Sequence, residues 1–271
     1  MKHRSTGVTR RGFLRLGTAG IAGLALFGPG LGHAAEPWQR LDEVQRLLDG
    51  ATPKRGGILL DLPSISQDGS SISLTVEVES PMTEEDYVEE LHLFAAGNPT
   101  PRIATVRFTP RAGRARISTR VRLDDSQPVV ALARTSDGEW RITHQDVRVT
   151  VSGCLQRADT YRSDNLMETR VRLPERFRTG EPGELRTLIQ HPMETGLRED
   201  GSGEVIPKRI IERFSAHVDG ERAVDVDLER SVAANPYFRF FLAPRGPGRV
   251  TLEWEEDTGE HVREEHDAEV A

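Results

Sequence analysis

Short runs of alternating apolar and polar residues, separated by turn-forming clusters, occupy most of the sequence. In the first half such runs cover residues 72–78 and 115–123, and Val147, Val149 and Val151 continue the pattern in a third run. Clusters that each contain a glycine separate the runs, at 67–69, 97–99, 111–113 and 136–138. Alternation with a period of two indicates strands that bury one face, and short strands without intervening helices are typical of a β-sandwich.

The second half repeats this pattern with different residues. Its candidate strands are 170–174, 184–189, 206–214, 237–242 and 249–254. Turns that contain glycine or proline separate them. The segment from residue 167 to residue 271 has the size of one sandwich domain.

A single amphipathic helix is predicted ahead of the first strands. Apolar residues recur there at helical spacing, at Trp38, Leu41, Val44, Leu47 and Leu48. Gly50 follows them as a stop signal. The expected fold class is therefore all-β, with two immunoglobulin-like β-sandwich domains, the first of which carries an N-terminal helix.

The expected domains span residues 35–154 and 167–271. Between them, residues 155–166 are polar and show no periodicity, which is typical of a linker. Fully extended, this linker would span about 40 Å.

Residues 1–34 have the features of an export signal. Arg10 and Arg11 are followed by Phe13 and Leu14, then by an apolar stretch that glycines interrupt and by a small-residue cleavage site at 32–34. The stretch is shorter than the ~20 apolar residues that cross a membrane. The paired arginines favour a twin-arginine signal, which exports folded proteins to the periplasm, over an ordinary secretory signal.

Removing this segment makes the chain strongly acidic. The segment holds five basic residues and no acidic one, so the formal net charge changes from −7 to −12. A chain with this charge does not attract nucleic acid or anionic membranes by its overall field. We therefore expect neither as a partner.

Cys154 is the only cysteine in the sequence and directly follows the last strand-like run of the first half. Ser152 and Gly153 precede it and place it in a turn. A single cysteine in an exported chain indicates a free reactive thiol or an intermolecular bond. The alternative is an incidental small residue packed under a loop.

No metal or catalytic site is expected elsewhere. His261 and His266 flank a glutamate pair, but their spacing of five does not place them on one helical face as in a zinc protease. The segment alternates like a charged edge strand instead. The sequence contains no second cysteine for a zinc site, no phosphate-binding loop and no nucleophile-elbow serine.

Several longer stretches carry a family resemblance. The second half resembles SoxZ, the smaller subunit of the sulfur-carrier complex of bacterial thiosulfate oxidation, through TLIQHPMETGLR at 187–198, IPKRII at 206–211 and ANPYF at 234–238. The first half resembles SoxY through its export signal, its N-terminal helix, FAAGNP at 94–99 and a last strand that leads to a cysteine. The chain is thus similar to a SoxY–SoxZ fusion, with Met167 as the remnant of the second subunit's start.

The resemblance implies a carrier and not an enzyme. Cys154 would hold thiosulfate-derived sulfur covalently, and no other cofactor is implied. A c-type cytochrome would load it, a sulfate-releasing hydrolase would cut it, and a further partner would oxidise the remaining sulfane sulfur or accept it. The sequence departs from the family at this point, because Ser152-Gly153 and Leu155-Gln156 replace two glycines on each side of the cysteine, and because the cysteine is internal.

Two alternatives stay open at the level of the sequence. The chain could be a SoxYZ-like accessory protein associated with a periplasmic quinoprotein dehydrogenase. It could also be an interaction module of two immunoglobulin-like domains in which Cys154 is inert.

Overall fold

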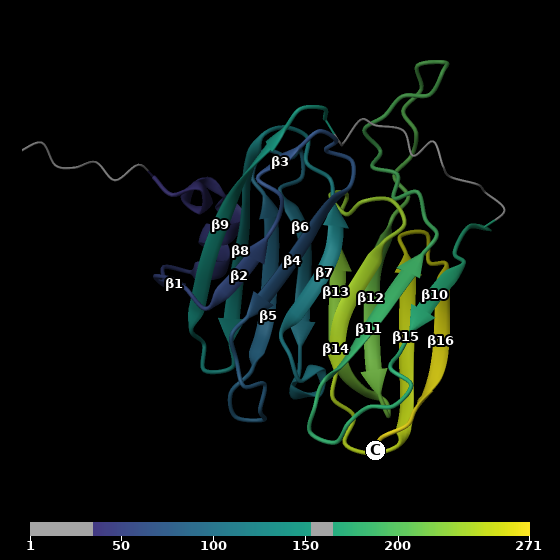
Figure 1. The fold of residues 1–271 in the computed structure, drawn as a ribbon. Coiled ribbons are helices and arrows are strands. Elements are labelled where there is room, and N and C mark those ends of the chain that lie inside the picture. The colour runs from purple at the N-terminus through teal and green to yellow at the C-terminus, as the bar shows by residue number, and fades with distance from the viewer. Residues whose placement is uncertain (1–34, 153–164) are drawn as a thin grey trace, which may run out of the picture. The chain divides into compact units, whose positions relative to one another are not determined.

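Two β-sheets packed face to face form the computed structural model, which describes residues 35–152 and 165–271 (Figure 1). Residues 35–271 form one compact unit. The larger sheet has ten strands in the order β1-β9-β8-β5-β6-β13-β12-β15-β16, with β3 beside β9. The smaller sheet has six strands in the order β10-β11-β14-β7-β4-β2. The all-β prediction is confirmed.

The strands of the larger sheet come from both halves of the chain. Their bounds are β1 Lys54–Arg55, β3 Ile65–Ser66, β5 Val88–Ala95, β6 Arg102–Phe108, β8 Gln127–Thr135, β9 Trp140–Val149, β12 Ile211–Val218, β13 Glu221–Leu228, β15 Gly248–Glu256 and β16 His261–Ala268. Those of the smaller sheet are β2 Ile58–Asp61, β4 Ile72–Val78, β7 Arg116–Val121, β10 Thr169–Arg172, β11 Gly183–Ile189 and β14 Tyr237–Leu242.

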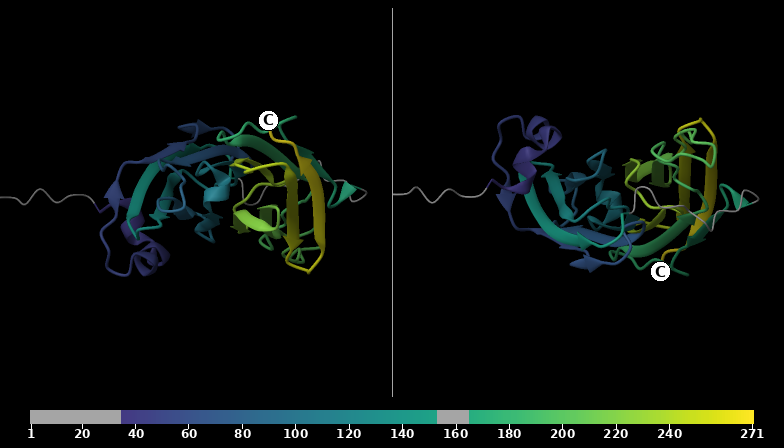
Figure 2. Two further views of the ribbon diagram at one scale, coloured as in Figure 1. Left: turned by 90° about the horizontal axis from the view of Figure 1, so that it is seen from below. Right: turned by 90° about the horizontal axis from the view of Figure 1, so that it is seen from above.

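Both sheets are continuous across the two halves. In the larger sheet β6 pairs antiparallel with β13, from Ala104 opposite Leu228 to Phe108 opposite Val224. In the smaller sheet β7 meets β14 where Ser118 lies opposite Arg239. Viewed along the strands in Figure 2, the two layers continue from the first half into the second. The two sandwiches that the sequence predicts are therefore joined edge to edge.

Aromatic side chains fill the space between the sheets in the second half. The ring of Phe214 on β12 lies 5.0 Å from Phe238 and 5.6 Å from Phe240, both on β14, and 5.2 Å from Trp254 on β15, measured between centroids. All four side chains are buried. Removing a ring of this size from water stabilises a fold by about 1.5–3 kcal/mol, so this cluster fixes the two layers to each other.

The N-terminal helix is divided in two. A 3₁₀ helix, η1 (Pro37–Arg40), is followed after the extended residue Leu41 by α1 (Asp42–Leu48). The predicted single helix was wrong in this respect, although its end at Gly50 agrees with the structure, where Asp49 and Gly50 have positive φ angles of 44° and 84°. Its apolar side covers the outer face of β5, β8 and β9, against Phe94, Val130, Leu132 and Ile142.

Most predicted strands are present. The runs 72–78 and 237–242 coincide with β4 and β14, and the charged edge strand expected at 261–266 is β16. In the candidate strand 206–214 only the part from Ile211 belongs to a strand, β12. Among the longer strands of the larger sheet, β5, β6, β8 and β13 were not predicted, and β6 and β13 are the two that join the halves. A second 3₁₀ helix, η2 (Pro110–Ala112), ends at Gly113, where φ is 64°. None of the helices in residues 35–152 and 165–271 has the length and apolar character to span a membrane.

Candidate functional site

The predicted site falls at the edge of what the structure describes. Cys154 and Gly153 lie outside the described residues, whereas Ser152 is the last residue described before them. The structure therefore defines the support of the cysteine, which we call the cysteine base: residues 149–152 at the end of β9 and the side chains and loops that hold them.

Backbone hydrogen bonds hold one side of the cysteine base. Strand β3 runs parallel to the end of β9, with Ser66 opposite Val149. Beyond the strand, the Thr150 N–H donates to the Ser66 carbonyl at 3.1 Å, and the Val151 carbonyl accepts from the Gly69 N–H at 2.9 Å. The chain is thus held in register as far as residue 151.

Side chains from the β7–β8 loop hold the other side. The Val149 N–H donates to Ser126 Oγ at 3.0 Å, and this hydroxyl donates to the Val149 carbonyl at 3.2 Å. The Ser152 hydroxyl donates to the Asp124 carboxylate. Ser152, predicted as a residue flanking the cysteine, is therefore the last fixed point before Cys154 along the chain.

Asn98 organises the β7–β8 loop. Its side-chain amide donates to the Arg122 carbonyl and to Ser231 Oγ, both at 2.8 Å. Its side-chain oxygen accepts from the Asp124 N–H at 2.9 Å and from Gln127 Nε2 at 2.8 Å. An asparagine side chain has two N–H donors and an oxygen with two lone pairs. All four are used here, in a residue that is 5% exposed.

Arg122 connects the same loop to the second half. Its guanidinium, which is buried, donates to the Met193 carbonyl at 2.6 Å and to the Pro192 carbonyl at 3.0 Å. Its backbone N–H donates to the Ser231 carbonyl at 2.7 Å. A charged donor in a buried position makes stronger hydrogen bonds than a neutral one, so Arg122 fixes the position of residues 192–193 against the cysteine base.

His191, directly before this segment, is held from both ring nitrogens. Its Nδ1 accepts from the Met193 N–H at 3.0 Å, which leaves Nε2 to donate to Glu256 at 2.8 Å. Glu256 also accepts from Arg209 Nε at 2.7 Å and from the Thr258 hydroxyl. Burial lowers the pKa of His191. Burial alone would raise the pKa of Glu256, but these hydrogen bonds outweigh it and lower that pKa. Neutral His191 beside ionised Glu256 is a structural pair that is inaccessible to solvent.

The chain returns to the same region after residue 164. The Met167 N–H donates to the Gln190 carbonyl, and the Gln190 N–H donates to the Glu168 carbonyl, both at 2.9 Å. Met167 is buried, with a φ of 64°. Residues 152 and 167 are thus both attached to elements that the Asn98 and Arg122 network holds together.

The described part of the cysteine base holds a chain segment in position. Among the described residues, no group of three or more histidines, aspartates and glutamates is placed to share a metal ion. The hydroxyls and amides of the cysteine base are hydrogen-bonded to one another and to the backbone. What the geometry does is fix the end of β9, so that the residues after Ser152 start from a defined position.

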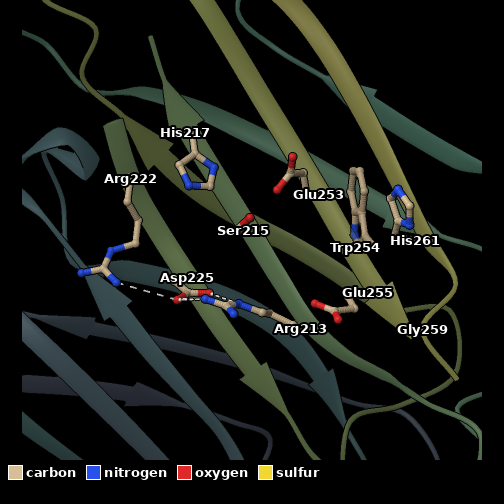
Figure 3. Close-up of a pocket in the computed structure, with 10 residues that line it drawn as sticks. All are labelled: Arg213, Ser215, His217, Arg222, Asp225, Glu253, Trp254, Glu255, Gly259 and His261. Atoms are coloured by element: carbon tan, nitrogen blue, oxygen red, sulfur yellow. Dashed lines mark hydrogen bonds and ion pairs between the residues drawn. The ribbon is translucent and has the colours of Figure 1, made fainter. Parts of the chain in front are cut away.

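A hollow of about 470 Å³ on the outer face of the larger sheet is a second candidate (Figure 3). Asp225 lies in it, 2% exposed, and accepts two hydrogen bonds from Arg213, at 3.1 and 3.0 Å. Arg222 lies 3.9 Å from the same carboxylate. His217, Glu253, Glu255 and His261 also line the hollow. Because its buried carboxylate is already matched by arginines, the hollow has no unsatisfied charge at its centre, and none of its residues belongs to the cysteine base.

The sequence analysis did not single out most of the residues that build the cysteine base. Asn98 lies within the FAAGNP stretch that carries the resemblance, which was a usable signal. Arg122, Asp124 and Ser126 lie in no such stretch. Their roles depend on partners that come close only in the folded chain.

Two protein families match the chain in tandem. The family described as sulfur oxidation protein SoxY matches residues 44–154, and the family described as sulphur oxidation protein SoxZ matches residues 171–267. The first match ends on Cys154. No curated protein matched the chain.

Solved structures with similar folds cover parts of the chain. The sulfur carrier protein SoxY from Chlorobium limicola f thiosulfatophilum is 22% identical, covers 42% of this chain and 98% of its own, and gives a TM-score of 0.35. A superoxide reductase (neelaredoxin) from Ignicoccus hospitalis is 15% identical, covers 35% of this chain and 80% of its own, and gives a TM-score of 0.31.

Proposed function

The chain belongs to the SoxY and SoxZ families as a fusion of the two, and we propose that it is a sulfur carrier that holds thiosulfate-derived intermediates on Cys154. The observation that carries the proposal is the end of the SoxY match on Cys154, directly after a chain segment that is fixed as far as Ser152. A carrier needs such a fixed starting point and a thiol beyond it that partners can reach.

The chemistry belongs to the thiolate. A cysteine thiolate is a strong nucleophile, and bonds between sulfur atoms form and break by exchange. Loading joins the Cys154 thiolate to the terminal sulfur of thiosulfate and releases two electrons, which a c-type cytochrome partner accepts. The product is a cysteine S-thiosulfonate, with one new S–S bond.

Unloading then proceeds in partner enzymes. A hydrolase adds water across the bond between the sulfane sulfur and the sulfonate group, which releases sulfate and two protons and leaves a persulfide on Cys154. A further partner oxidises or accepts this sulfane sulfur. The chain itself catalyses none of these steps, and it needs no cofactor because the intermediate is bound to its own cysteine.

Export fits the same proposal. The twin-arginine segment would deliver the folded fusion to the periplasm in one piece, so one signal serves both halves. The acidic mature chain would work there with Sox partner proteins and not with nucleic acid or membranes.

Intact-protein mass spectrometry tests the proposal. The exported protein is isolated from host cells grown with thiosulfate, beside a Cys154→Ser variant. We expect adducts with the mass of thiosulfate or of added sulfur atoms on the native chain and none on the variant.

A Cys154 thiol that stays unmodified while the host oxidises thiosulfate would contradict the carrier role. The chain would then be better described as an accessory protein of a quinoprotein dehydrogenase or as an interaction module, whose activity would survive the Cys154→Ser substitution.

A further inference from the structure

The outer face of the smaller sheet is unusually rich in arginine. In strands β10, β11, β14 and β7 every second residue lies on the outer face of the sheet. We call the outward residues of these four strands the arginine face. It holds one carboxylate, that of Glu184, and six arginines: Arg170, Arg172, Arg186, Arg239, Arg116 and Arg120. Arg116 is paired at 3.0 Å with Glu77 on the neighbouring strand β4.

Three of these arginines form a row across adjacent strands. Arg172 lies opposite Arg186, and Arg186 lies opposite Arg239. Neighbouring strands are about 4.8 Å apart, and like charges placed directly opposite each other destabilise a sheet. A row of this kind lowers the stability of the isolated protein, so it indicates that these arginines interact with another molecule.

The carboxylates nearby do not neutralise the row. Glu184 lies 2.6 Å from Arg186 and 3.9 Å from Arg239, and it is shared between them. Within residues 35–152 and 165–271, neither Arg170 nor Arg172 has an ion-pair partner. The face is therefore basic on a chain whose formal net charge is −7.

The opposite face of the same half shows that this imbalance is local. In the hollow of Figure 3, Arg213 is matched to Asp225. On the neighbouring strands, Arg263 pairs with Glu253 and Glu265, and Arg249 pairs with Glu265. Arginines are common throughout the chain, but on that face they are balanced by carboxylates.

Several groups on the arginine face are already held in place. Arg239 donates to Ser118 Oγ at 3.1 and 3.3 Å, and Arg120 donates to the Asn235 carbonyl at 2.8 Å. The guanidinium of Arg120 also lies 6.0 Å from the centre of the Tyr237 ring. Fixed guanidiniums lose less entropy when they bind, and arginine with tyrosine is the composition of energetically important protein interfaces.

We infer that the arginine face is a docking surface for a protein partner with an acidic surface. Its arginines extend over four strands and alternate with the half-buried side chains of Leu188, Tyr237 and Phe241. A small anion would contact one or two guanidiniums, whereas an acidic protein surface would match the whole area. Opposite charge on the partner would also raise the rate of encounter.

The position of this face connects it to the cysteine base. Strand β7 leads directly into Arg122, and β10 begins two residues after Met167. A partner docked here would contact two strands that continue along the chain into Arg122 and back to Met167. That this partner acts on Cys154 rests on the proposed function, whereas docking itself requires only the arginines.

The test uses the full exported chain with Cys154→Ser, so that docking is measured without the thiol. Arg172→Gln and Arg186→Gln together neutralise the row. Arg249→Gln and Arg263→Gln together are the matched control, because they remove the same charge from exposed arginines on the opposite face. Thermal unfolding of both variants verifies that they are folded.

The first measurement is binding of a fluorescent deca-glutamate peptide to the purified proteins at low salt, followed by fluorescence anisotropy. We expect the row variant to bind about tenfold more weakly than the parent chain and the control variant to change by less than about twofold. Equal weakening in both variants, or no binding to the parent chain, would overturn the inference.

The second measurement identifies the partner in cells. A photo-reactive benzoylphenylalanine at Leu188, in the middle of the face, is crosslinked in the host, and the attached peptide is sequenced by mass spectrometry. We expect the crosslink to join this chain to a different protein, through a segment rich in aspartate and glutamate. The crosslinking yield should fall about fivefold in the row variant and stay unchanged in the control variant. Crosslinking to a second copy of this chain or to a basic segment would contradict the inference. A crosslinking yield that the row variant does not lower would contradict it as well.

Discussion

The aromatic core of the second half and the cysteine base hold distant parts of the chain together by different forces. Around Phe214, rings from three strands are joined by burial, which has no preferred direction and is proportional to the apolar area removed from water. Around Asn98, five groups are joined by hydrogen bonds whose donors and acceptors must meet at defined distances.

The difference has a consequence for what each region can do. A packed core tolerates small shifts of its members as long as its volume is filled. A saturated hydrogen-bond network has one low-energy arrangement, because a partner that moves leaves a buried donor or acceptor unpaired. The cysteine base is therefore suited to fixing a starting point for the chain, and the core is suited to holding the layers together.

The largest expected effect is on the core. Phe214→Ala removes a ring that contacts Phe238, Phe240 and Trp254 and leaves a cavity between the sheets. We expect the free energy of unfolding to fall by about 3–5 kcal/mol. Denaturant titration measures this, with Phe241→Ala, on the outer face of the smaller sheet, as a control that should lose much less. A loss below about 1 kcal/mol would mean that the core is not continuous at this point.

Asn98→Ala should lower the free energy of unfolding less than Phe214→Ala does, but it should disturb the cysteine base more. It leaves four hydrogen-bonding groups without their partner, and we expect a loss of about 1–3 kcal/mol. Hydrogen–deuterium exchange should rise at residues 149–151 and stay unchanged in β12. Asn165→Ala, at an exposed residue, is the matched control. If exchange rose equally in both segments, the base would not be a separate polar unit.

The His191–Glu256 pair makes stability depend on pH. Because the native fold lowers the pKa of His191 below the ordinary value of about 6.5, the unfolded chain binds a proton first as the pH falls. The contribution of His191 to the free energy of unfolding is then fully present above about pH 6.5. Below that pH the free energy of unfolding decreases, by at most about 1.4 kcal/mol per pH unit for one proton. Burial lowers the pKa of His92 as well, so this residue contributes in the same direction.

Thermal unfolding between pH 7.5 and 5.5 measures this dependence. His191→Gln, which keeps a donor for Glu256, should reduce the slope without removing the part due to His92. A slope that stays the same in His191→Gln would assign the dependence to other groups.

The smallest expected effect is that of Ser152→Ala. It removes one half-buried hydrogen bond, to Asp124, and should lower the free energy of unfolding by less than about 1 kcal/mol. Exchange at the Val149 amide, which Ser126 holds independently, should not change. An increase there would show that the two hydroxyls act as one unit and would make the base more cooperative than its geometry indicates.

Local sequence predicted the fold class and a little over half of the strands, because alternation and turn residues act over short distances. It did not reveal β5, β6, β8 or β13 of the larger sheet. In β13, Val224, Val226 and Leu228 alternate with Asp225 and Asp227. Aspartate is depleted in strands, and these two are accommodated because Arg213 and Arg107 on neighbouring strands pair with them. That compensation comes from the fold and is not readable within the segment.

Of the candidate site, the sequence predicted the cysteine but not the residues that support it. Cys154 stands out because it is the only cysteine, and the resemblance gives it a role. Its support could not be read in the same way, since the hydrogen bond from Asn98 to Ser231 joins residues 133 positions apart. A network of this kind is defined by contacts that exist only once both halves have folded onto each other.

The seam between β6 and β13 has a consequence for how the molecule assembles. If either half folded alone, the strand at this seam would be a free edge, with its N–H and C=O groups available to pair with any other exposed strand. In a single polypeptide the complementary edge is always present at high local concentration and in equal number. The fusion thus supplies each edge with its own partner during folding, which guards the newly made protein against aggregation and mispairing.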